Sequence, residues 1–368
     1  MSEAATFVYV SAAEDGIIDS YVMDAGTGAL TPIGKAEAGK TVMPMAVAPD
    51  KKFLYAVVRS EPMRVLTYAI DSSSGALTQK ATAPLPDSMA YASTDRSGRF
   101  LLTASYGGDK VAVSPIGGDG LITAAATQVL PTGRNAHSIL VDRTNRFVYA
   151  ALLGANCVLQ FAFDAKTGKL TPLDPPAVSP EPGHGPRHLA FSPDNKFLYV
   201  PNELSGYVTQ YAIDSTKGTL KPLDSVPSVP AELGMKWGQP QVPSSAAPTA
   251  PAPKADTKPD EKPPIWAADL RLTPNGKFLY TTERNTNKIA LFTVAPDSGK
   301  LTYVTNFATE RQPRGINIDP SGHYLVAAGV KSDRLSVYGI DQTSGKLGEP
   351  KRYLVGKGAN WIEIVEVN

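Results

Sequence analysis

Residues 53–78, FLYAVVRSEPMRVLTYAIDSSSGALT, decide the fold of this chain. The stretch holds two apolar runs, at 53–58 and 65–70, and turn residues at 71–75 lead into a third run at 77–81. Short runs rich in valine, isoleucine and aromatic residues between such turns are typical of β-strands. Together with residues 44–48 just upstream, the stretch predicts a unit of four short strands.

Two phrases of this unit recur along the whole chain. A Gly-x-Leu-Thr phrase or a close relative begins at Gly28, Gly75, Gly120, Gly168, Gly218, Gly299 and Gly345. An aromatic residue followed by a short apolar run begins at Phe7, Phe53, Phe100, Phe147, Phe197, Phe278 and Tyr324. Both phrases recur every 45 to 50 residues, apart from one interval of 81. Seven units of four antiparallel strands at this period, without strong helix patterns, predict an all-β, seven-bladed β-propeller.

The two ends of the chain predict how the ring closes. Residues 7–11 match the second strand of a blade, whereas residues 360–367 match a first strand. We therefore expect the C-terminal strand to join the N-terminal blade, which removes an exposed sheet edge. We interpret residues 1–368 as one propeller domain.

The long interval contains an insertion at about residues 231–264, between the fifth and sixth units. Its core, residues 239–264, consists mostly of proline, alanine, serine, lysine and aspartate. Such a composition buries too little apolar surface to offset the entropy lost on ordering. We expect a flexible loop, either a spacer or a lid, with Met235 and Trp237 near its start as anchors to the rim.

Composition limits the partners of the protein. Lysine and arginine number 36 against 35 for aspartate and glutamate, and this balance argues against nucleic-acid and membrane-surface binding. One cysteine, Cys157, and four histidines leave no disulfide framework and little for a metal site. The N-terminus lacks the pattern of a secretory signal, and no run of about 18 apolar residues occurs, so we expect a cytoplasmic protein.

The place of a residue in the repeat predicts where it lies in the ring. The start of each innermost strand and the end of the next strand lie at the same mouth of the central channel. A purely structural repeat would carry apolar or small residues there, but six of these positions, in five units, are ionisable: Arg59, His137, Arg187, Glu203, Arg284 and Arg314. Each alone could be a structural ion pair or hydrogen-bonded group. Together they predict a site for an anion, because a guanidinium matches phosphate or carboxylate.

Other polar residues lie near these positions. Asn202 and Asp269 are one residue away, and either bind the ligand or serve as turn and counter-ion residues. His188 follows Arg187 on a predicted strand, so we expect it to point the opposite way and pack between blades. His184 lies in a turn rich in glycine and proline and is expected to be exposed.

Several phrases of the sequence occur in a known family. They are PMAVAPDK (44–51), AHS (136–138), GPRHLAF (185–191), FLY (197–199), NEL (202–204), WAAD (266–269), QPRG (312–315), SGHYLVAAG (321–329) and GANW (358–361). As a set they resemble the lactonase family of seven-bladed propellers, and the resemblance runs from Phe7 to Val367. The insertion departs from the family pattern.

The resemblance implies hydrolysis of 6-phospho-D-glucono-1,5-lactone to 6-phosphogluconate without a metal or other cofactor. The implied catalytic residues, matched phrase by phrase, are His137, Arg187, Glu203 and Arg284. Arg271 is a less favoured choice for the second arginine, because it lies inside a predicted strand. The further substrate contacts that we expect are Arg59, Arg314, Asp269 and Asn202. Whether His137 or Glu203 is the general base stays open, as does the choice of arginine for the phosphate.

Two other functions stay open at this point. One is an enzyme that forms or opens a lactone of a carboxylated muconate, since arginine binds carboxylate as well as phosphate. The other is a non-enzymatic propeller scaffold, for which an apolar rim patch would be more typical than an arginine cluster. For the first-named function the expected partner is a small anionic sugar lactone, and the protein is expected to be a monomer or weak homodimer.

Overall fold

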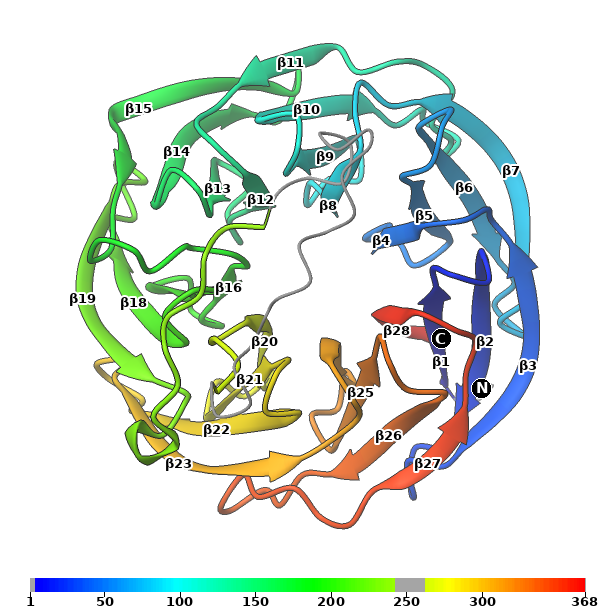
Figure 1. The fold of residues 1–368 in the computed structure, drawn as a ribbon. Coiled ribbons are helices and arrows are strands. Elements are labelled where there is room, and N and C mark those ends of the chain that lie inside the picture. The colour runs from blue at the N-terminus through cyan, green and yellow to red at the C-terminus, as the bar shows by residue number, and fades with distance from the viewer. Residues whose placement is uncertain (1–3, 242–261, 368) are drawn as a thin grey trace, which may run out of the picture.

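The computed structural model describes residues 4–241 and 262–367 of the chain. Seven four-stranded antiparallel sheets stand around a common axis like the blades of a propeller (Figure 1). Among the described residues the one helix is a short 3₁₀-helix, η1 (Ala231–Leu233). The predicted all-β, seven-bladed propeller is therefore confirmed.

Each blade is ordered here from the ring axis outward. The first consists of β28 (Ala359–Val367), β1 (Ala5–Ala12), β2 (Ile17–Met23) and β3 (Leu30–Glu37). The second to fourth consist of β4 (Val42–Val47), β5 (Phe53–Val58), β6 (Arg64–Ile70) and β7 (Leu77–Pro84); β8 (Met89–Thr94), β9 (Phe100–Ser105), β10 (Lys110–Pro115) and β11 (Gln128–Pro131); and β12 (Ala136–Val141), β13 (Phe147–Leu152), β14 (Cys157–Asp164) and β15 (Lys169–Val178). The fifth to seventh consist of β16 (Ala190–Phe191), β17 (Phe197–Pro201), β18 (Tyr207–Ile213) and β19 (Leu220–Pro227); β20 (Ala267–Leu272), β21 (Phe278–Glu283), β22 (Lys288–Val294) and β23 (Leu301–Ala308); and β24 (Pro313–Ile318), β25 (Tyr324–Gly329), β26 (Arg334–Gly339) and β27 (Lys351–Leu354).

The C-terminal strand completes the N-terminal blade. β28 pairs antiparallel with β1, from Ala5 opposite Val367 to Ala12 opposite Ala359. The two ends of the chain therefore lie in one sheet, where the red and dark blue strands meet in Figure 1. The predicted closure is confirmed, and β1 has a hydrogen-bonded neighbour on each side.

Adjacent blades are locked together by the two residues that mark the repeat. The ring of each aromatic marker packs on the marker glycine of the next blade, as Phe147 does on Gly218. Beside this contact the Tyr149 hydroxyl donates a hydrogen bond to the Gly218 carbonyl over 2.7 Å. Gly218 has a backbone φ of +74° and leaves room for the ring, which a residue with a Cβ would not. Both phrases recur because each blade meets its neighbour through the same contact.

Replacing Gly218 by alanine is expected to destabilise the fold by roughly 2–5 kcal/mol. The new Cβ would overlap the Phe147 ring, and alanine disfavours the left-handed backbone at this position. Denaturant unfolding measures the change. Gly34→Ala is the matched control, because a Cβ at Gly34 meets nothing within 4 Å. Equal stability of the two variants would contradict the interlock.

Most innermost strands carry a β-bulge near their first residue. The pairing register shifts around His137 in β12 and around Arg314 in β24. A bulge leaves its extra residue unpaired and re-aims that side chain. His137 and Arg314 therefore leave the regular alternation of their strands, at equivalent places in two blades.

The first part of the insertion follows a defined path across the blades. Beyond η1, the Trp237 ring packs edge-on against His184, so Trp237 acts as the predicted anchor. The chain then runs inward over the ring, and the Tyr106 hydroxyl donates a hydrogen bond to the Gln241 carbonyl over 2.9 Å (Figure 1). The predicted flexible core lies largely in residues 242–261, which are outside the described residues.

Candidate active site

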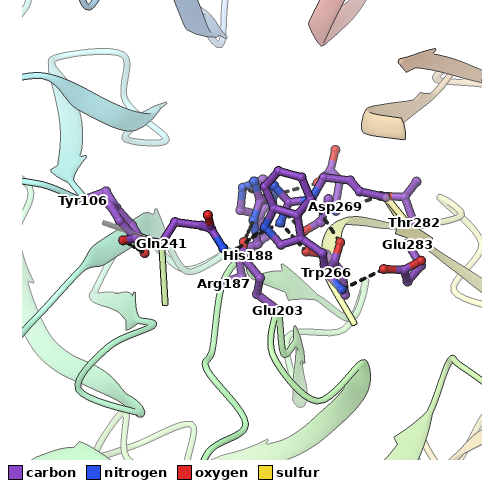
Figure 2. A network of polar contacts seen from close by, with 12 residues as sticks. Tyr106, Arg187, His188, Glu203, Gln241, Trp266, Asp269, Thr282 and Glu283 are labelled. Atoms are coloured by element: carbon purple, nitrogen blue, oxygen red, sulfur yellow. Dashed lines mark hydrogen bonds and ion pairs between the residues drawn. The ribbon is translucent and has the colours of Figure 1, made fainter. Parts of the chain in front are cut away.

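Glu203 is the centre of the candidate site. It follows β17, and its Oε2 accepts hydrogen bonds from Arg187 Nε and Arg284 Nη2, each over 2.7 Å. Its Oε1 accepts a hydrogen bond from Trp266 Nε1 over 3.2 Å (Figure 2). Both arginines and Glu203 are at most 3% exposed. Segments of the fifth and sixth blades thus converge on one buried carboxylate.

Arg284 is fixed by the chain around Trp266. Its Nε donates to the Trp266 carbonyl over 3.0 Å, and its Nη2 donates to the Ala267 carbonyl over 2.8 Å. The guanidinium carbon lies 3.7 Å from the centre of the Trp266 ring, within the range of a cation–π interaction. The sequence analysis did not identify Trp266 as a site residue. Trp266 has no charge, so the search for ionisable residues at the repeat positions could not find it. The only sequence signal for Trp266 was its place in the phrase at 266–269.

Each of these two arginines keeps one guanidinium nitrogen unused. Arg187 Nη1 donates to the Ala268 carbonyl over 2.6 Å and to His188 Nε2 over 3.0 Å. In contrast, Arg187 Nη2 and Arg284 Nη1 have no hydrogen-bond acceptor among the described residues. Two fixed N–H donors of this kind are suited to an oxygen atom that becomes negatively charged during a reaction.

Glu203 stays ionised between the two cations. Burial alone would raise the pKa of Glu203, but the charges of Arg284 and Arg187 hold it below its ordinary value. Burial lowers the pKa of Arg284 to about 10, so this arginine remains protonated at neutral pH. A carboxylate with a low pKa and both oxygens engaged is a poor acceptor for a further proton.

His137 is a buried, neutral histidine beside this cluster. Its ring lies 5.7 Å from the ring of Tyr106 and 5.3 Å from the ring of His188, centre to centre. Burial, reinforced by the charge of Arg187, lowers the pKa of His137 well below 6.5. Its Nδ1 is buried and has no hydrogen-bond partner among the described residues. The imidazole is therefore uncharged at neutral pH and not engaged by a carboxylate.

Arg59 and Arg314 complete the cluster from the second and seventh blades. Arg59 follows β5, is half-buried, and donates from Nε to Ser88 Oγ over 2.9 Å. Arg314 is also half-buried, and its side chain has no hydrogen bond or ion pair with any described residue. Burial lowers the pKa of Arg314, and the charges of Arg187 and two other arginines lower it further. Arg314 therefore lies within electrostatic range of Arg59, Arg187, Arg284 and Glu203, and it also acts on His137, so it links the six predicted residues.

Asp269 belongs to a network beneath the cluster. Its Oδ1 accepts from His188 Nδ1 and from Arg271 Nη1, each over 2.8 Å, and its Oδ2 accepts from the Ile316 amide over 3.1 Å. Arg271, among other groups, holds the pKa of the buried Asp269 at about 2 although burial opposes this. Both oxygens are engaged, so the structure places Asp269 as a counter-ion rather than as an open substrate contact. Arg271 pairs with Asp269 and not with Glu203.

Asn202 lies within its blade. Its Nδ2 donates to the Tyr207 carbonyl over 3.0 Å and to Thr209 Oγ1 over 2.8 Å. The Asn202 side chain is fully buried and faces the neighbouring strand β18. The Asn202 amide nitrogen is therefore engaged within its own blade, whereas its buried Oδ1 has no hydrogen-bond partner among the described residues, and a substrate contact by Asn202 stays a prediction.

Two expectations for histidines are wrong. His188 does not point away from Arg187, because residues 187–189 precede the short strand β16 and do not follow the alternation of a regular strand. Instead His188 links Arg187 to Asp269 (Figure 2). His184 is 3% exposed rather than on the surface, because Trp237 covers it and Ser205 Oγ lies 3.1 Å from its Nδ1.

Among residues 4–241 and 262–367, no three His, Cys, Asp or Glu side chains are grouped so that they could hold a metal ion. In the same ranges, no helix has the length and apolar character that a membrane crossing requires.

The fold and the cluster together define a β-propeller with a cationic cluster at one end of its strands. Four arginines, one ionised glutamate and one neutral histidine gather at equivalent ends of its strands. The sequence matches the family described as "Lactonase, 7-bladed beta-propeller" over residues 7–364. The chain therefore belongs to this lactonase family, as the resemblance of its phrases predicts.

Individual relatives cover almost the entire chain. A 6-phosphogluconolactonase from Pectobacterium carotovorum is 37% identical over 361 residues, which cover 98% of this chain and 99% of the relative. A 6-phosphogluconolactonase from Serratia proteamaculans is 37% identical over 359 residues, which cover 97% and 98%. The solved structure of a periplasmic gluconolactonase from Pseudomonas aeruginosa has a TM-score of 0.84 at 26% identity and covers both chains fully. A protein from Lactobacillus plantarum shares the fold, with a TM-score of 0.81 at 23% identity over 99% of this chain and 100% of its own.

Proposed function

We propose that this protein hydrolyses 6-phospho-D-glucono-1,5-lactone to 6-phosphogluconate at the arginine cluster. The observation that carries the proposal is the surplus of positive charge: Arg187 and Arg284 share the Glu203 carboxylate, and Arg314 lies within electrostatic range of both and of Arg59 but forms no ion pair among the described residues. The substrate phosphate carries roughly −1.5 to −2 charges near neutral pH and is attracted by such a surplus. The names of the 37%-identical relatives support the same substrate.

In the proposed reaction a water molecule attacks the carbonyl carbon of the lactone. His137 accepts a proton from that water, and the carbonyl oxygen becomes an oxyanion. The unused nitrogens of Arg187 and Arg284 donate hydrogen bonds to this oxyanion. The ring C–O bond then breaks, and the departing oxygen takes the proton from His137 and becomes a hydroxyl. The net change is the addition of one water molecule.

We assign the base to His137 rather than to Glu203. The Glu203 oxygens already accept from Arg187, Arg284 and Trp266, and the low pKa of Glu203 makes it a weak base. The His137 ring is neutral and has a nitrogen without a partner. In this assignment Glu203 orients the two arginines.

The test is lactone hydrolysis by the purified protein. Freshly generated 6-phosphogluconolactone is added, and 6-phosphogluconate is detected by NADP reduction with an added 6-phosphogluconate dehydrogenase. We expect a rate far above spontaneous hydrolysis and unchanged by EDTA, because every proposed step uses protein side chains and water. A rate no faster than that of spontaneous hydrolysis in buffer would exclude the proposal. It would favour a carboxylated lactone as the substrate.

The pH dependence of kcat provides a separate prediction. A base works in its unprotonated form, so a lowered pKa of His137 moves the acid loss of activity to lower pH. We expect kcat to stay constant from about pH 8 to about pH 6, where a histidine of ordinary pKa would already be largely protonated. A profile of kcat, measured at saturating lactone, tests this. An inflection near the ordinary histidine pKa would contradict the assignment.

A further inference from the structure

The positive charge of the cluster is unevenly neutralised. Arg187 and Arg284 share the Glu203 carboxylate, so one negative charge lies between two positive ones. Arg59 and Arg314 form no ion pair with any carboxylate among the described residues. The cluster therefore has a partly neutralised side on the fifth and sixth blades. On the second and seventh blades it has a side whose arginines form no ion pair with a described carboxylate.

The carboxylate whose charge acts on Arg59 is already engaged elsewhere. That carboxylate is Asp87, and Lys110 Nζ lies 2.7 Å from its Oδ2. Arg59 uses only its Nε, toward Ser88, and both of its terminal nitrogens have no acceptor among the described residues. All three guanidinium nitrogens of Arg314 are likewise without an acceptor in the described part of the chain.

The backbone places Arg314 in this position. It is the extra residue of the bulge in β24, and the bulge frees its side chain from the pairing of the strand. A half-buried guanidinium among other cations and without an acceptor is unfavourable unless an anion joins it. The same reasoning applies to Arg59, which is also half-buried.

We propose that Arg59 and Arg314 form a clamp that holds the phosphate of the substrate and sets the preference for a phosphorylated over an unphosphorylated sugar lactone. Two planar guanidinium forks offer parallel N–H donors to the phosphate oxygens. At this side the phosphate meets the two arginines that form no ion pair with Glu203, whose charge would repel it. This inference rests on the proposed lactonase function.

The clamp also explains why two arginines would bind the carbonyl oxygen of the lactone and the other two its phosphate. The carbonyl oxygen of the lactone is neutral in the substrate and becomes anionic during the reaction. A half-neutralised pair such as Arg187 and Arg284, with one free donor each, matches that oxygen. The permanent charge of the phosphate is matched by the two arginines that form no ion pair with a described carboxylate.

The experiment compares kcat/KM for 6-phosphogluconolactone and for unphosphorylated glucono-1,5-lactone. In Arg59→Gln and in Arg314→Gln the ratio of the two values is expected to fall roughly 10- to 100-fold, in favour of the unphosphorylated lactone. In Arg187→Lys both values are expected to fall while their ratio changes less than about threefold. Arg334→Gln is the control, since Arg334 is an exposed arginine of the same blade as Arg314.

The outcomes separate the clamp from other roles. A drop in the ratio for both clamp variants supports the inference. An equal loss of kcat/KM with both lactones would mean that Arg59 and Arg314 position parts of the substrate that both lactones share. No loss of kcat/KM with either lactone would mean that the two arginines do not contribute to the reaction. Either result overturns the clamp. Melting temperatures close to that of the unchanged protein ensure that the comparison concerns folded variants.

A binding measurement separates failure of the clamp from failure of the proposed function. Calorimetric titration with 6-phosphogluconate and with gluconate needs no turnover. If the unchanged protein hydrolyses neither lactone, the proposed function fails. The clamp is then judged by binding: tighter binding of 6-phosphogluconate than of gluconate, lost in Arg59→Gln and Arg314→Gln, supports it. Binding unaffected by either substitution overturns it.

Discussion

Replacing Arg187 by alanine is expected to lower kcat/KM for the lactone roughly 10³-fold and to destabilise the protein by roughly 3–5 kcal/mol. The side chain is 1% exposed, so nothing replaces its contacts. Its loss leaves the Glu203 charge with a single arginine and the Ala268 carbonyl without the donor at 2.6 Å. It also removes one of the two free donors that we assign to the oxyanion.

The two effects of Arg187→Ala are measured separately. Denaturant unfolding reports stability, and the coupled lactonase assay is run below the melting temperature of the variant. Arg187→Lys keeps the charge but not the planar fork that reaches Glu203 Oε2 and the Ala268 carbonyl together, so we expect only partial recovery. Full activity of folded Arg187→Ala would contradict the proposed site.

His137→Ala is expected to lower kcat roughly 10²- to 10⁴-fold with little change in KM. The imidazole is the neutral proton acceptor in the proposed reaction, and it makes no ion pair that would hold the ground-state substrate. Removing it therefore affects the chemical step more than binding. Steady-state kinetics with the phosphorylated lactone measure this split.

The control for this experiment is His323→Ala. His323 is exposed and its Nδ1 lies 2.8 Å from Ser321 Oγ, in a turn outside the cluster. This variant is expected to keep the rate of the unchanged protein. If His137→Ala retained that rate as well, Glu203 or water alone would have to supply the base, and the assignment to His137 would be wrong.

The repeat explains why the fold was predictable. Phe147 and Gly218 represent seven pairs of residues that lock adjacent blades, and because each pair makes the same contact, two phrases recur along the sequence. The closing strand was predictable too, because a chain that begins with a second strand needs a first strand from elsewhere. In both cases the physical requirement repeats along the chain and can be counted.

The membership of the cluster was predictable for the same reason. Equivalent repeat positions lie at equivalent ends of strands, so ionisable side chains at those positions had to gather at one end of the ring. Arg187, Glu203 and Arg284 are joined by hydrogen bonds there. The charge of Arg314 acts on Glu203, and the charge of Arg59 acts on Arg314.

The roles within the cluster were not predictable from the repeat. His188 departs from strand alternation because the chain before β16 is irregular, and a pattern based on regular strands cannot show that. Asp269 turned out to be engaged by His188 and Arg271, which lie in two different segments. Trp266 carries no charge, so a search for ionisable residues at equivalent repeat positions could not identify it.

By itself the sequence determined the number of blades, the closure of the ring and the set of charged residues at one end of it. These follow from periodicity, which depends only on the order of residues along the chain. The tertiary structure alone decided which charges are neutralised. Glu203 meets Arg187 and Arg284, whereas Arg314 meets no carboxylate among the described residues. Pairing depends on side-chain directions set by bulges and by contacts between blades, and these directions separate the proposed catalytic arginines from the proposed phosphate clamp.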